Sequence, residues 1–325
     1  MTGSVRIDAS WRLRTRTLAL GQRTLVMGVV NVTPDSFSDG GPFLDPQAAI
    51  AHGLRLLDDG ADLLDLGAES TRPGSRTGAA ARSVHGTVYP NDEDPSLRTP
   101  GVSAATVSAD EEQARLLPVL EGILRTRPDA VISVDTYKAA TARAALDAGA
   151  EIVNDVSGFL WDPAIAAVCA EFEAGVVLMH TRGRPEEWRV QPQLPPDELL
   201  ATVRSGLAAS VAAADEAGIP REAIVLDPGY GFGKRFDENY ALLARQAELL
   251  ALGRPLLAGL SRKSFLGRTL APLHGGEGAP VDSRETASIA ALVAAILHGA
   301  SIVRVHAVRP AVEAALIADA ILAAG

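Results

Sequence analysis

The sequence predicts a closed (β/α)8 barrel built as a single domain. Apolar runs of strand length recur eight times along the chain, and a stretch of helical period follows each of them. Several of these helices end in a glycine just before the next run, as in DDGADLLD and HGASIVRVH. The runs are apolar on both faces, which is typical of a parallel sheet that helices cover on each side. Eight such units in 325 residues favour a closed barrel over an open, doubly wound sheet.

The expected elements follow from the same pattern. We expect strands at residues 26–32, 62–70, 131–136, 151–157, 175–181, 223–229, 255–263 and 301–308. We expect helices at residues 46–59, 109–127, 138–148, 163–173, 197–217, 238–251, 284–298 and 309–323. Residues 1–23 form an N-terminal segment and residues 24–325 the barrel. A long insertion at about 75–108, after the second strand, is rich in Gly, Pro, Ser and Thr and is expected to be irregular.

Composition excludes several classes of protein. The net charge of −10 argues against a nucleic-acid surface, which needs a basic stripe, so any phosphate ligand must be met by locally placed Arg and Lys. The single cysteine, Cys169, excludes an internal disulfide and is expected in the core. The N-terminus has no apolar signal region, and no uncharged stretch reaches the about 20 residues that span a bilayer. The sequence therefore predicts a cytoplasmic protein without membrane or nucleic-acid partners.

Polar residues follow the apolar runs, where the strands of such a barrel end. In this architecture the active site lies at the carboxyl ends of the strands, where the loops converge. The residues at these positions are Asn31, Glu69, Thr71, Arg72, Asp135, Asn154, His180, Asp227, Lys263, Arg304 and His306. They bring both signs of charge to one pocket, which suits a ligand with a hydrogen-bonding heterocycle at one end and an anion at the other. His180 could equally be a packed histidine at the mouth, and Trp188 a loop anchor.

The segment VLDPGYGFGK, residues 225–234, is glycine-rich and ends in lysine, but it is not a nucleotide-binding loop. The P-loop pattern requires a glycine five places before Gly233 and a Ser or Thr after the lysine, where this chain has Pro228 and Arg235. The spacing of the glycines also fails the dinucleotide fingerprint. Asp227 therefore stands at the end of a strand, ahead of a proline and three glycines, without a nucleotide to explain it.

The motifs of the chain resemble those of the dihydropteroate synthases, a pterin-binding barrel family. The segments that carry the resemblance occur in the family's order and spacing: MGVVNVTPDSFSDGG, DLGAESTRPG, ISVDT, NDVSG, LMH, LDPGYGFGK, GLSRKSFLG and RVH. They span about residues 24 to 320, and NVTPDSFSDGG with ESTRPG and SRKS is highly specific. The resemblance implies folate biosynthesis, in which 6-hydroxymethyl-7,8-dihydropterin pyrophosphate condenses with p-aminobenzoate to give 7,8-dihydropteroate and pyrophosphate, assisted by Mg²⁺.

The resemblance also implies roles for individual residues. It assigns the pterin pocket to Asp135, Asn154, Asp227, Lys263 and Arg304, with Asp227 reading the amino-pyrimidinone edge. It assigns the pyrophosphate site to Asn31, Thr71, Arg72, Arg304 and His306, with Asn31 also binding Mg²⁺. It assigns the p-aminobenzoate pocket to Phe37, Thr71, Pro73, Phe232 and Ser264. The catalytic residues are then Asp135, Arg72, Lys263, Arg304 and His306, and no obligatory general base is needed.

A homodimer is expected through the helix at residues 284–299, which is apolar almost all round, and the resemblance implies the same. A barrel helix with two apolar faces usually covers something beyond its own sheet. The expected interface therefore includes this helix and its neighbours.

Three positions depart from the family pattern: Ala68 where Gly is usual, Tyr137 where Ser is common, and Ala307 where RVHDV is typical. The last removes a charge beside His306 and leaves its orientation open. Two other functions compete. Corrinoid methyltransferases share the pterin carboxylates but do not need a pyrophosphate clamp, so ESTRPG, SRKS and RVH weigh against them. A non-catalytic pterin-binding or phosphate-binding paralogue would be expected to lose clamp residues such as Arg72 or Lys263, and none is lost.

Overall fold

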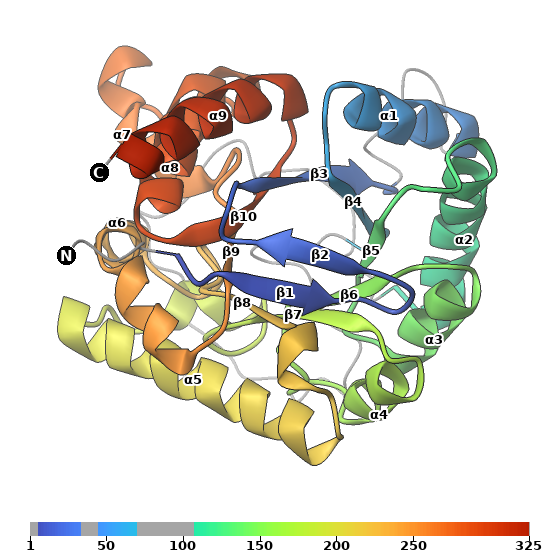
Figure 1. Cartoon of the computed structure of the whole chain (residues 1–325). Helices are drawn as coiled ribbons and strands as arrows, with labels where there is room; N and C mark the ends of the chain where they lie inside the picture. The colour runs from blue at the N-terminus through green and yellow to red at the C-terminus, as the bar shows by residue number, and fades with distance from the viewer. Residues whose placement is uncertain (1–5, 34–44, 70–106, 325) are drawn as a thin grey trace.

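Eight parallel strands close into a barrel in the computed structural model, which describes residues 6–33, 45–69 and 107–324 (Figure 1). In chain order the strands are β3 (Leu25–Asn31), β4 (Leu63–Gly67), β5 (Ile132–Asp135), β6 (Ile152–Asp155), β7 (Gly175–Met179), β8 (Ile224–Asp227), β9 (Leu256–Ala258) and β10 (Ala300–Val305). Each strand pairs with the next in the chain, and β10 pairs with β3 to close the ring. The expected (β/α)8 barrel is thus confirmed.

Helices form the outer layer of the barrel. Those in the described part of the chain are α1 (Pro46–Asp58), α2 (Ala109–Thr126), α3 (Ala139–Asp147), α4 (Ala164–Glu171), α5 (Pro196–Glu216), α6 (Phe236–Ala244), α7 (Ser264–Thr269), α8 (Glu285–Leu297) and α9 (Val308–Ala324). None of them is long and apolar enough to cross a bilayer. The insertion expected at about 75–108 lies almost entirely outside the described residues.

The structure departs from the expected helices in two places. The helix expected at residues 238–251 is in fact α6 followed by a 3-10 helix, Gln246–Leu252. At the start of this 3-10 helix the Gln246 side chain is buried, and its amide accepts from the Tyr230 hydroxyl at 2.7 Å and donates to the carbonyl of Ala295 at 3.0 Å. The short helix α7 was not expected, and it begins directly after Lys263.

Alternation along each strand divides its side chains between two environments. In β4, Leu63 points into the barrel, whereas Leu64 and Leu66 belong to the apolar shell between the sheet and the helices. By the same alternation Asp65 points into the barrel, and it is fully buried there. The barrel interior is therefore not apolar throughout.

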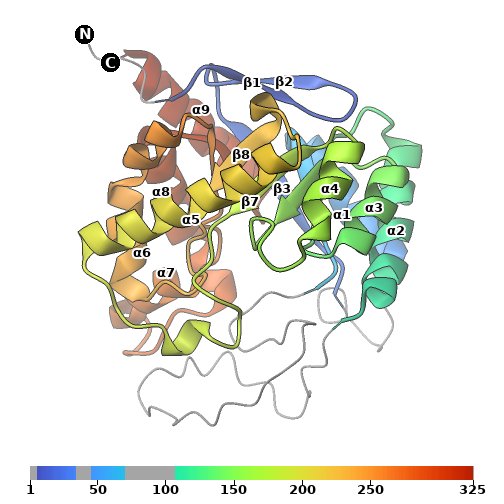
Figure 2. The ribbon, with the colours of Figure 1, turned by 90° about the horizontal axis from the view of Figure 1, so that it is seen from below.

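A β-hairpin seals the amino-terminal end of the barrel. Its strands β1 (Ala9–Arg12) and β2 (Thr17–Leu20) pair antiparallel, and Figure 2 shows the hairpin at one end of the molecule. Its side chains pack against the lower interior residues of the strands in one apolar cluster: Trp11, Leu13, Leu20, Leu25, Met27, Leu63, Val131, Ile152, Val177, Val225, Leu257 and Ile302. The Trp11 indole N–H donates to the carbonyl of Ala223 at 2.9 Å. Within the expected N-terminal segment, residues 9–20 thus contribute to the core.

We expect Trp11→Ala to lower the free energy of unfolding by about 3–5 kcal/mol, because it leaves a cavity where a fully buried indole fills the barrel floor. Urea unfolding followed by circular dichroism measures this loss. The matched control is Leu273→Ala, since Leu273 is 79% exposed and its truncation should change stability by less than about 0.5 kcal/mol. Equal losses in both variants would show that the hairpin does not contribute to the core.

Candidate functional site

A buried polar layer lies above the apolar floor of the barrel, and Asp65 is at its centre. The Asp65 carboxylate accepts hydrogen bonds from the Ser133 hydroxyl at 2.6 Å, the Asn154 amide at 3.0 Å and the Arg304 Nε at 2.6 Å. These four residues come from β4, β5, β6 and β10, all with side chains directed inward. The layer brings both signs of charge into the barrel, as the strand-end residues predicted.

Arg304 joins this layer to the mouth of the barrel. Its Nη2 donates to Asp135 Oδ2 at 2.8 Å, so one guanidinium bridges the carboxylates of Asp65 and Asp135. Burial raises the pKa of Asp135 to about 7, although the Arg304 charge opposes the shift. Among the described residues the Arg304 Nη1 has no hydrogen-bond partner, so this nitrogen can bind a ligand.

Asp227 lies across the barrel at the end of β8. Its Oδ1 accepts from the backbone N–H of Gly229 at 2.7 Å, which orients the carboxylate. Burial raises the pKa of Asp227, and the Gly229 hydrogen bond opposes that shift. Gly259, directly after β9, faces both Asp227 and Arg304: a Cβ there would lie 3.8 Å from Asp227 Oδ2 and 3.9 Å from Arg304 Cβ. The absence of a side chain at Gly259 keeps the space between these two charged groups open.

Lys263 and Phe232 form the adjacent wall. The Lys263 Nζ lies 4.0 Å from the centre of the Phe232 ring, a cation–π contact. Burial lowers the pKa of Lys263 to about 8, although the Asp227 carboxylate opposes the shift. A Cβ at Gly231 would lie 3.5 Å from Lys263 Cδ, so this glycine leaves room for the lysine side chain. Phe232 in turn packs edge-on against Trp188, with ring centres 5.0 Å apart, so Trp188 does anchor the loop.

His306 is oriented by Ser261. The Ser261 Oγ lies 3.0 Å from His306 Nδ1 and accepts from the His306 backbone N–H at 3.2 Å. Ala307 left the orientation of the His306 ring open, and the structure shows that the Ser261 hydroxyl, which follows the neighbouring strand β9, contacts that ring. Tyr137 has a similar explanation, because its hydroxyl donates to Glu69 at 3.3 Å.

Glu69 is held in a buried ion-pair network. Lys138 pairs with Glu69 and, at 2.9 Å, with Glu112, whose carboxylate also accepts from the Thr141 hydroxyl at 2.8 Å. Burial raises the pKa of Glu69, and the Lys138 hydrogen bond opposes this shift. These contacts fix the end of β4 to the outer helices. Ala68 beside it is fully buried in the outer apolar shell.

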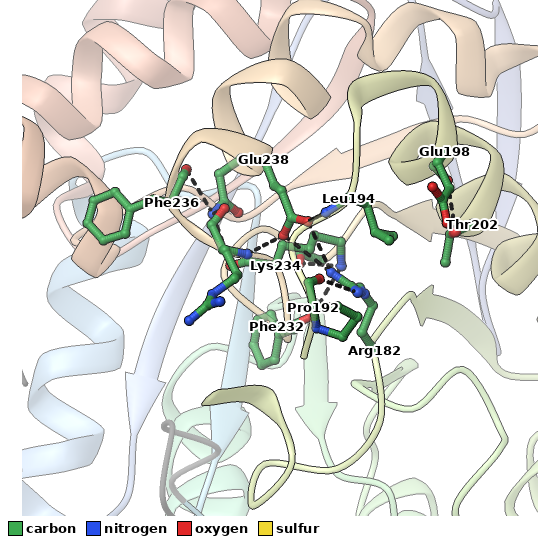
Figure 3. Close-up of polar contacts among 12 residues, drawn as sticks. Arg182, Pro192, Leu194, Glu198, Thr202, Phe232, Lys234, Phe236 and Glu238 are labelled. Atoms are coloured by element: carbon green, nitrogen blue, oxygen red, sulfur yellow. Dashed lines mark hydrogen bonds and ion pairs between the residues drawn. The ribbon is translucent and has the colours of Figure 1, made fainter. Parts of the chain in front are cut away.

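The loop after β7 is joined to the first turn of α6 by an ion pair, which Figure 3 shows between Arg182 and Glu238. Arg182 Nη1 donates to Glu238 Oε1 at 3.1 Å, and Nη2 donates to the carbonyl of Pro192 at 2.8 Å. Glu238 also accepts from the backbone N–H of Leu194 at 2.7 Å and from that of Arg235. Glu238 thus ties three backbone segments together behind Phe232.

Lys234, the last residue of the glycine-rich segment, points into its own loop rather than toward a ligand (Figure 3). Its Nζ donates to the carbonyls of Gly229 at 2.8 Å, His180 at 3.1 Å and Phe232 at 3.3 Å. Burial lowers the pKa of Lys234 to about 7, although Asp227 opposes the shift. The lysine that gives the segment the appearance of a phosphate-binding loop therefore stabilises the backbone of the loop that carries Phe232.

The remaining predicted residues have mixed outcomes. Asn31 stands half-buried at the end of β3, and Ser264 is exposed at the first turn of α7. Phe37, Thr71, Arg72 and Pro73 lie outside the described residues, so their roles stay predictions. His180 is packed: its Nδ1 is buried without a hydrogen-bond partner in the described chain, and burial keeps its pKa well below the ordinary value. Cys169 is buried in the core, as expected.

Three residues of the site were missed by sequence reasoning. Asp65 and Ser133 were overlooked because they lie inside strands rather than at the strand ends, although their two-residue spacing from Gly67 and Asp135 places them on the inward face. Ser261 was passed over beside Lys263, because its contact with His306 joins residues 45 positions apart. Inward-facing polar residues within strands would have been the signal for Asp65 and Ser133, and no local pattern marks Ser261.

Comparisons with known proteins agree with this geometry. The sequence pattern of the pterin binding enzyme family matches residues 27–85 and 98–306. The dihydropteroate synthase of Mycobacterium leprae is 43% identical over 304 residues, which cover 92% of this chain and 94% of the relative. The solved structure of Xanthomonas albilineans dihydropteroate synthase with 4-aminobenzoic acid is 38% identical, with a TM-score of 0.78 and coverage of 98% of this chain and 99% of that one. The same enzyme in complex with 7,8-dihydropteroate matches at 37% identity and a TM-score of 0.75, over 97% and 99% of the two chains.

We expect Arg182→Met to lower the free energy of unfolding by about 3–5 kcal/mol, because it leaves the Glu238 carboxylate buried without its cation. Denaturant unfolding measures the loss. The matched control is Arg143→Met, which breaks an exposed pair with Glu171 and should produce no measurable change. An Arg182→Met variant as stable as this control would mean that water, rather than Arg182, stabilises Glu238.

Proposed function

The chain belongs to the dihydropteroate synthases of the pterin binding enzyme family, and we propose that its barrel mouth joins a dihydropterin pyrophosphate to p-aminobenzoate. In this reaction the bond between the pterin methylene carbon and the pyrophosphate oxygen breaks. A bond forms from the same carbon to the arylamine nitrogen, which loses a proton. The products are 7,8-dihydropteroate and pyrophosphate.

The observation that carries this proposal is the polar layer inside the barrel. The Arg304 guanidinium pairs with the carboxylates of Asp65 and Asp135 above a sealed apolar floor, and the Asp227 carboxylate lies near the Arg304 side chain across Gly259. A flat heterocycle with several N–H donors would pair with the part of the Asp227 carboxylate that the Gly229 N–H does not contact, and a buried acceptor of this kind costs about 1–3 kcal/mol when unpaired. An apolar ligand would leave that oxygen unpaired.

The pterin end is read by Asp227 and Asn154 in this proposal. The Gly229 N–H donates to Asp227 Oδ1, which leaves Oδ2 to accept from the amino-pyrimidinone edge. The Asn154 amide donates to Asp65, which leaves its carbonyl oxygen to accept from the ring. Asp65 contributes by fixing the Asn154 amide and the Arg304 guanidinium at the same time.

Catalysis is electrostatic in this proposal. Departure of pyrophosphate leaves a cationic methylene-pterin, which the Asp135 carboxylate stabilises, while Arg304, His306 and Lys263 stabilise the departing anion. The Arg304 Nη1 is the nitrogen available for this contact. Thr71 and Arg72 complete the pyrophosphate site by resemblance, and no residue need act as an obligatory base.

The arylamine is placed at the outer edge of the site. Phe232 supplies an aromatic wall that Trp188 and Lys234 hold in position, and Ser264 supplies a hydroxyl at the start of α7. Phe37, Thr71 and Pro73 are the further residues that the resemblance assigns to this pocket. This arrangement puts the pterin deep and p-aminobenzoate shallow.

We also propose Mg²⁺ as the metal, held by the Asn31 side-chain oxygen and by the pyrophosphate itself. The donors present fit this ion, because Mg²⁺ takes oxygen ligands and usually keeps few protein ligands beside substrate phosphates. Among the described residues no cluster of three His, Cys, Asp or Glu could hold a metal alone. When bound, the ion neutralises charge on the leaving pyrophosphate.

A homodimer in the cytoplasm completes the proposal. Among the described residues, α9 carries three large apolar side chains that are each more than half exposed, Leu316, Ile317 and Ile321, while Ile289 and Val293 of the adjoining α8 are half-buried. A neighbouring subunit covering this face would remove the apolar stripe from water. Light scattering should give twice the chain mass at micromolar concentration, and Ile317→Glu should give the single mass. A monomeric wild-type protein would contradict the dimer.

The activity is tested by measuring pyrophosphate release from the dihydropterin pyrophosphate with p-aminobenzoate and Mg²⁺. Asp227→Asn should weaken pterin binding by about 2–4 kcal/mol in calorimetry, because it replaces an acceptor by a donor and leaves a buried partner unpaired. Asp197→Asn on the exposed start of α5 is the control and should bind the pterin as the wild type does. Pterin binding without pyrophosphate release would instead support a non-catalytic paralogue.

The rate should depend on pH with a maximum between the pKa values of Asp135 and Lys263. The Asp135 carboxylate must be ionised, so kcat/KM for the pterin substrate should rise through about pH 7. The Lys263 amine must be charged, so kcat/KM should fall through about pH 8. Lys263→Arg keeps the charge at every accessible pH and should remove the falling limb alone. A wild-type profile that is flat from about pH 6 to about pH 9 would exclude these roles.

A further inference from the structure

We propose that Arg284 and Ser288, at the beginning of α8, are positioning residues that hold a strained turn of the active site. The turn consists of Ser261, Arg262 and Lys263, and we call it the SRK turn. This inference rests on the proposed function, because it assigns a role in that reaction to two residues that do not touch the substrates.

The strain lies at Arg262, whose φ of 59° is in the left-handed region. The Lys263 N–H reaches back to the carbonyl of Leu260 at 3.4 Å, so Arg262 is the third residue of a four-residue turn. A positive φ at this position is normally supplied by glycine, because a side chain with a Cβ collides with its own backbone there. Such a conformation persists in a bulky residue only when the surroundings hold it.

The first turn of α8 holds both backbone groups of Arg262. The Ser288 Oγ accepts from the Arg262 N–H at 2.9 Å, and the Arg284 Nη1 donates to the Arg262 carbonyl at 3.2 Å. Ser288 also donates to the carbonyl of Arg284 at 2.8 Å, which links the two residues to each other. Both side chains are buried, so water does not compete for these bonds.

Two further contacts fix the Arg284 side chain itself. Its Nε donates to the carbonyl of Ala279 at 2.7 Å, and it passes close to Gly267 of α7, where a Cβ would collide with the guanidinium. The Arg262 side chain approaches the same helix, with its Nε 3.6 Å from Glu285 Oε2. The SRK turn is thus fastened to α8 by both its backbone and its side chain.

The SRK turn determines where two charged groups of the site lie. Ser261 at its beginning contacts His306 Nδ1 at 3.0 Å, and Lys263 at its end places Nζ over the Phe232 ring at 4.0 Å. A turn that relaxed to negative φ at Arg262 would redirect both residues. Ser288 and Arg284 therefore act on the pyrophosphate side of the reaction through Ser261 and Lys263.

The test is a double-mutant cycle between Ser288→Ala and Arg262→Gly. Ser288→Ala should lower kcat/KM for the pterin pyrophosphate about tenfold, as the loss of a buried hydrogen bond would. Glycine adopts the left-handed conformation without support from Ser288. In the Arg262→Gly background, Ser288→Ala should therefore lower kcat/KM by less than about threefold. Ser210→Ala is the matched control: its buried hydroxyl also donates to the carbonyl four residues earlier, at 3.3 Å, but it lies on α5, away from the turn.

Hydrogen exchange of the residue 262 amide gives a readout that does not depend on activity. It should accelerate in Ser288→Ala and stay unchanged in Ser210→Ala. Wild-type kcat/KM in Ser288→Ala, or losses that simply multiply in the double variant, would overturn the inference. If Ser288→Ala does not fold, Arg284→Lys enters the same cycle, since it keeps the charge but loses the forked geometry. A wild-type protein without activity would contradict the proposed function, while the amide exchange would still test the contact.

Discussion

One guanidinium between two carboxylates, inside the barrel, is the interaction on which the site depends. Burying the Asp65 or Asp135 charge alone would cost several kcal/mol, and the Arg304 ion pairs with both offset that cost. Ser133 and Asn154 supply the remaining hydrogen bonds of Asp65, so its carboxylate is satisfied from three sides. Because the group holds two negative charges to one positive, it favours a cation that develops beside it.

The alternation of the strands makes this burial possible. Inward positions near the start of each strand are apolar and pack on the hairpin, and most inward positions nearer the end are polar, with Met179 of β7 as an exception. A single barrel thus has a lower half that provides stability and an upper half that provides chemistry. Stability and chemistry depend on different residues of the same strands. The buried charges of the upper half can therefore lower the stability of the fold without disturbing the apolar packing of the lower half.

Much of this arrangement could be predicted from sequence, because strand ends are recognisable by pattern. The strand-end positions of Asp135, Asn154, Asp227 and Arg304 are confirmed, whereas their roles in catalysis stay predictions. Pattern alone did not separate neighbours such as Asn154, which points inward, from Asp155, whose carboxylate accepts from the N–H groups of Ser157 and Phe159 in the following turn.

What the sequence did not reveal depends on contacts between distant segments. The pairing of Ser261 with His306 and the hold of α8 on Arg262 join residues that no local pattern links. Asp65 is a different case. The two-residue period of its strand places it on the inward face, but the site was predicted only from residues at strand ends. The hairpin was missed because two strands of four residues each carry too little periodicity to be recognised.

The hairpin also determines from which end of the barrel a ligand reaches the site. Trp11 and its neighbours close one end of the barrel, so among the described residues the way into the site lies at the opposite rim, beside Phe232 and Ser264. Asp227 and Asn154 lie below that rim. In the proposed reaction the pterin pyrophosphate would therefore enter before p-aminobenzoate, and the product, held by its pterin end, would leave arylamine end first through the opening by which both substrates came.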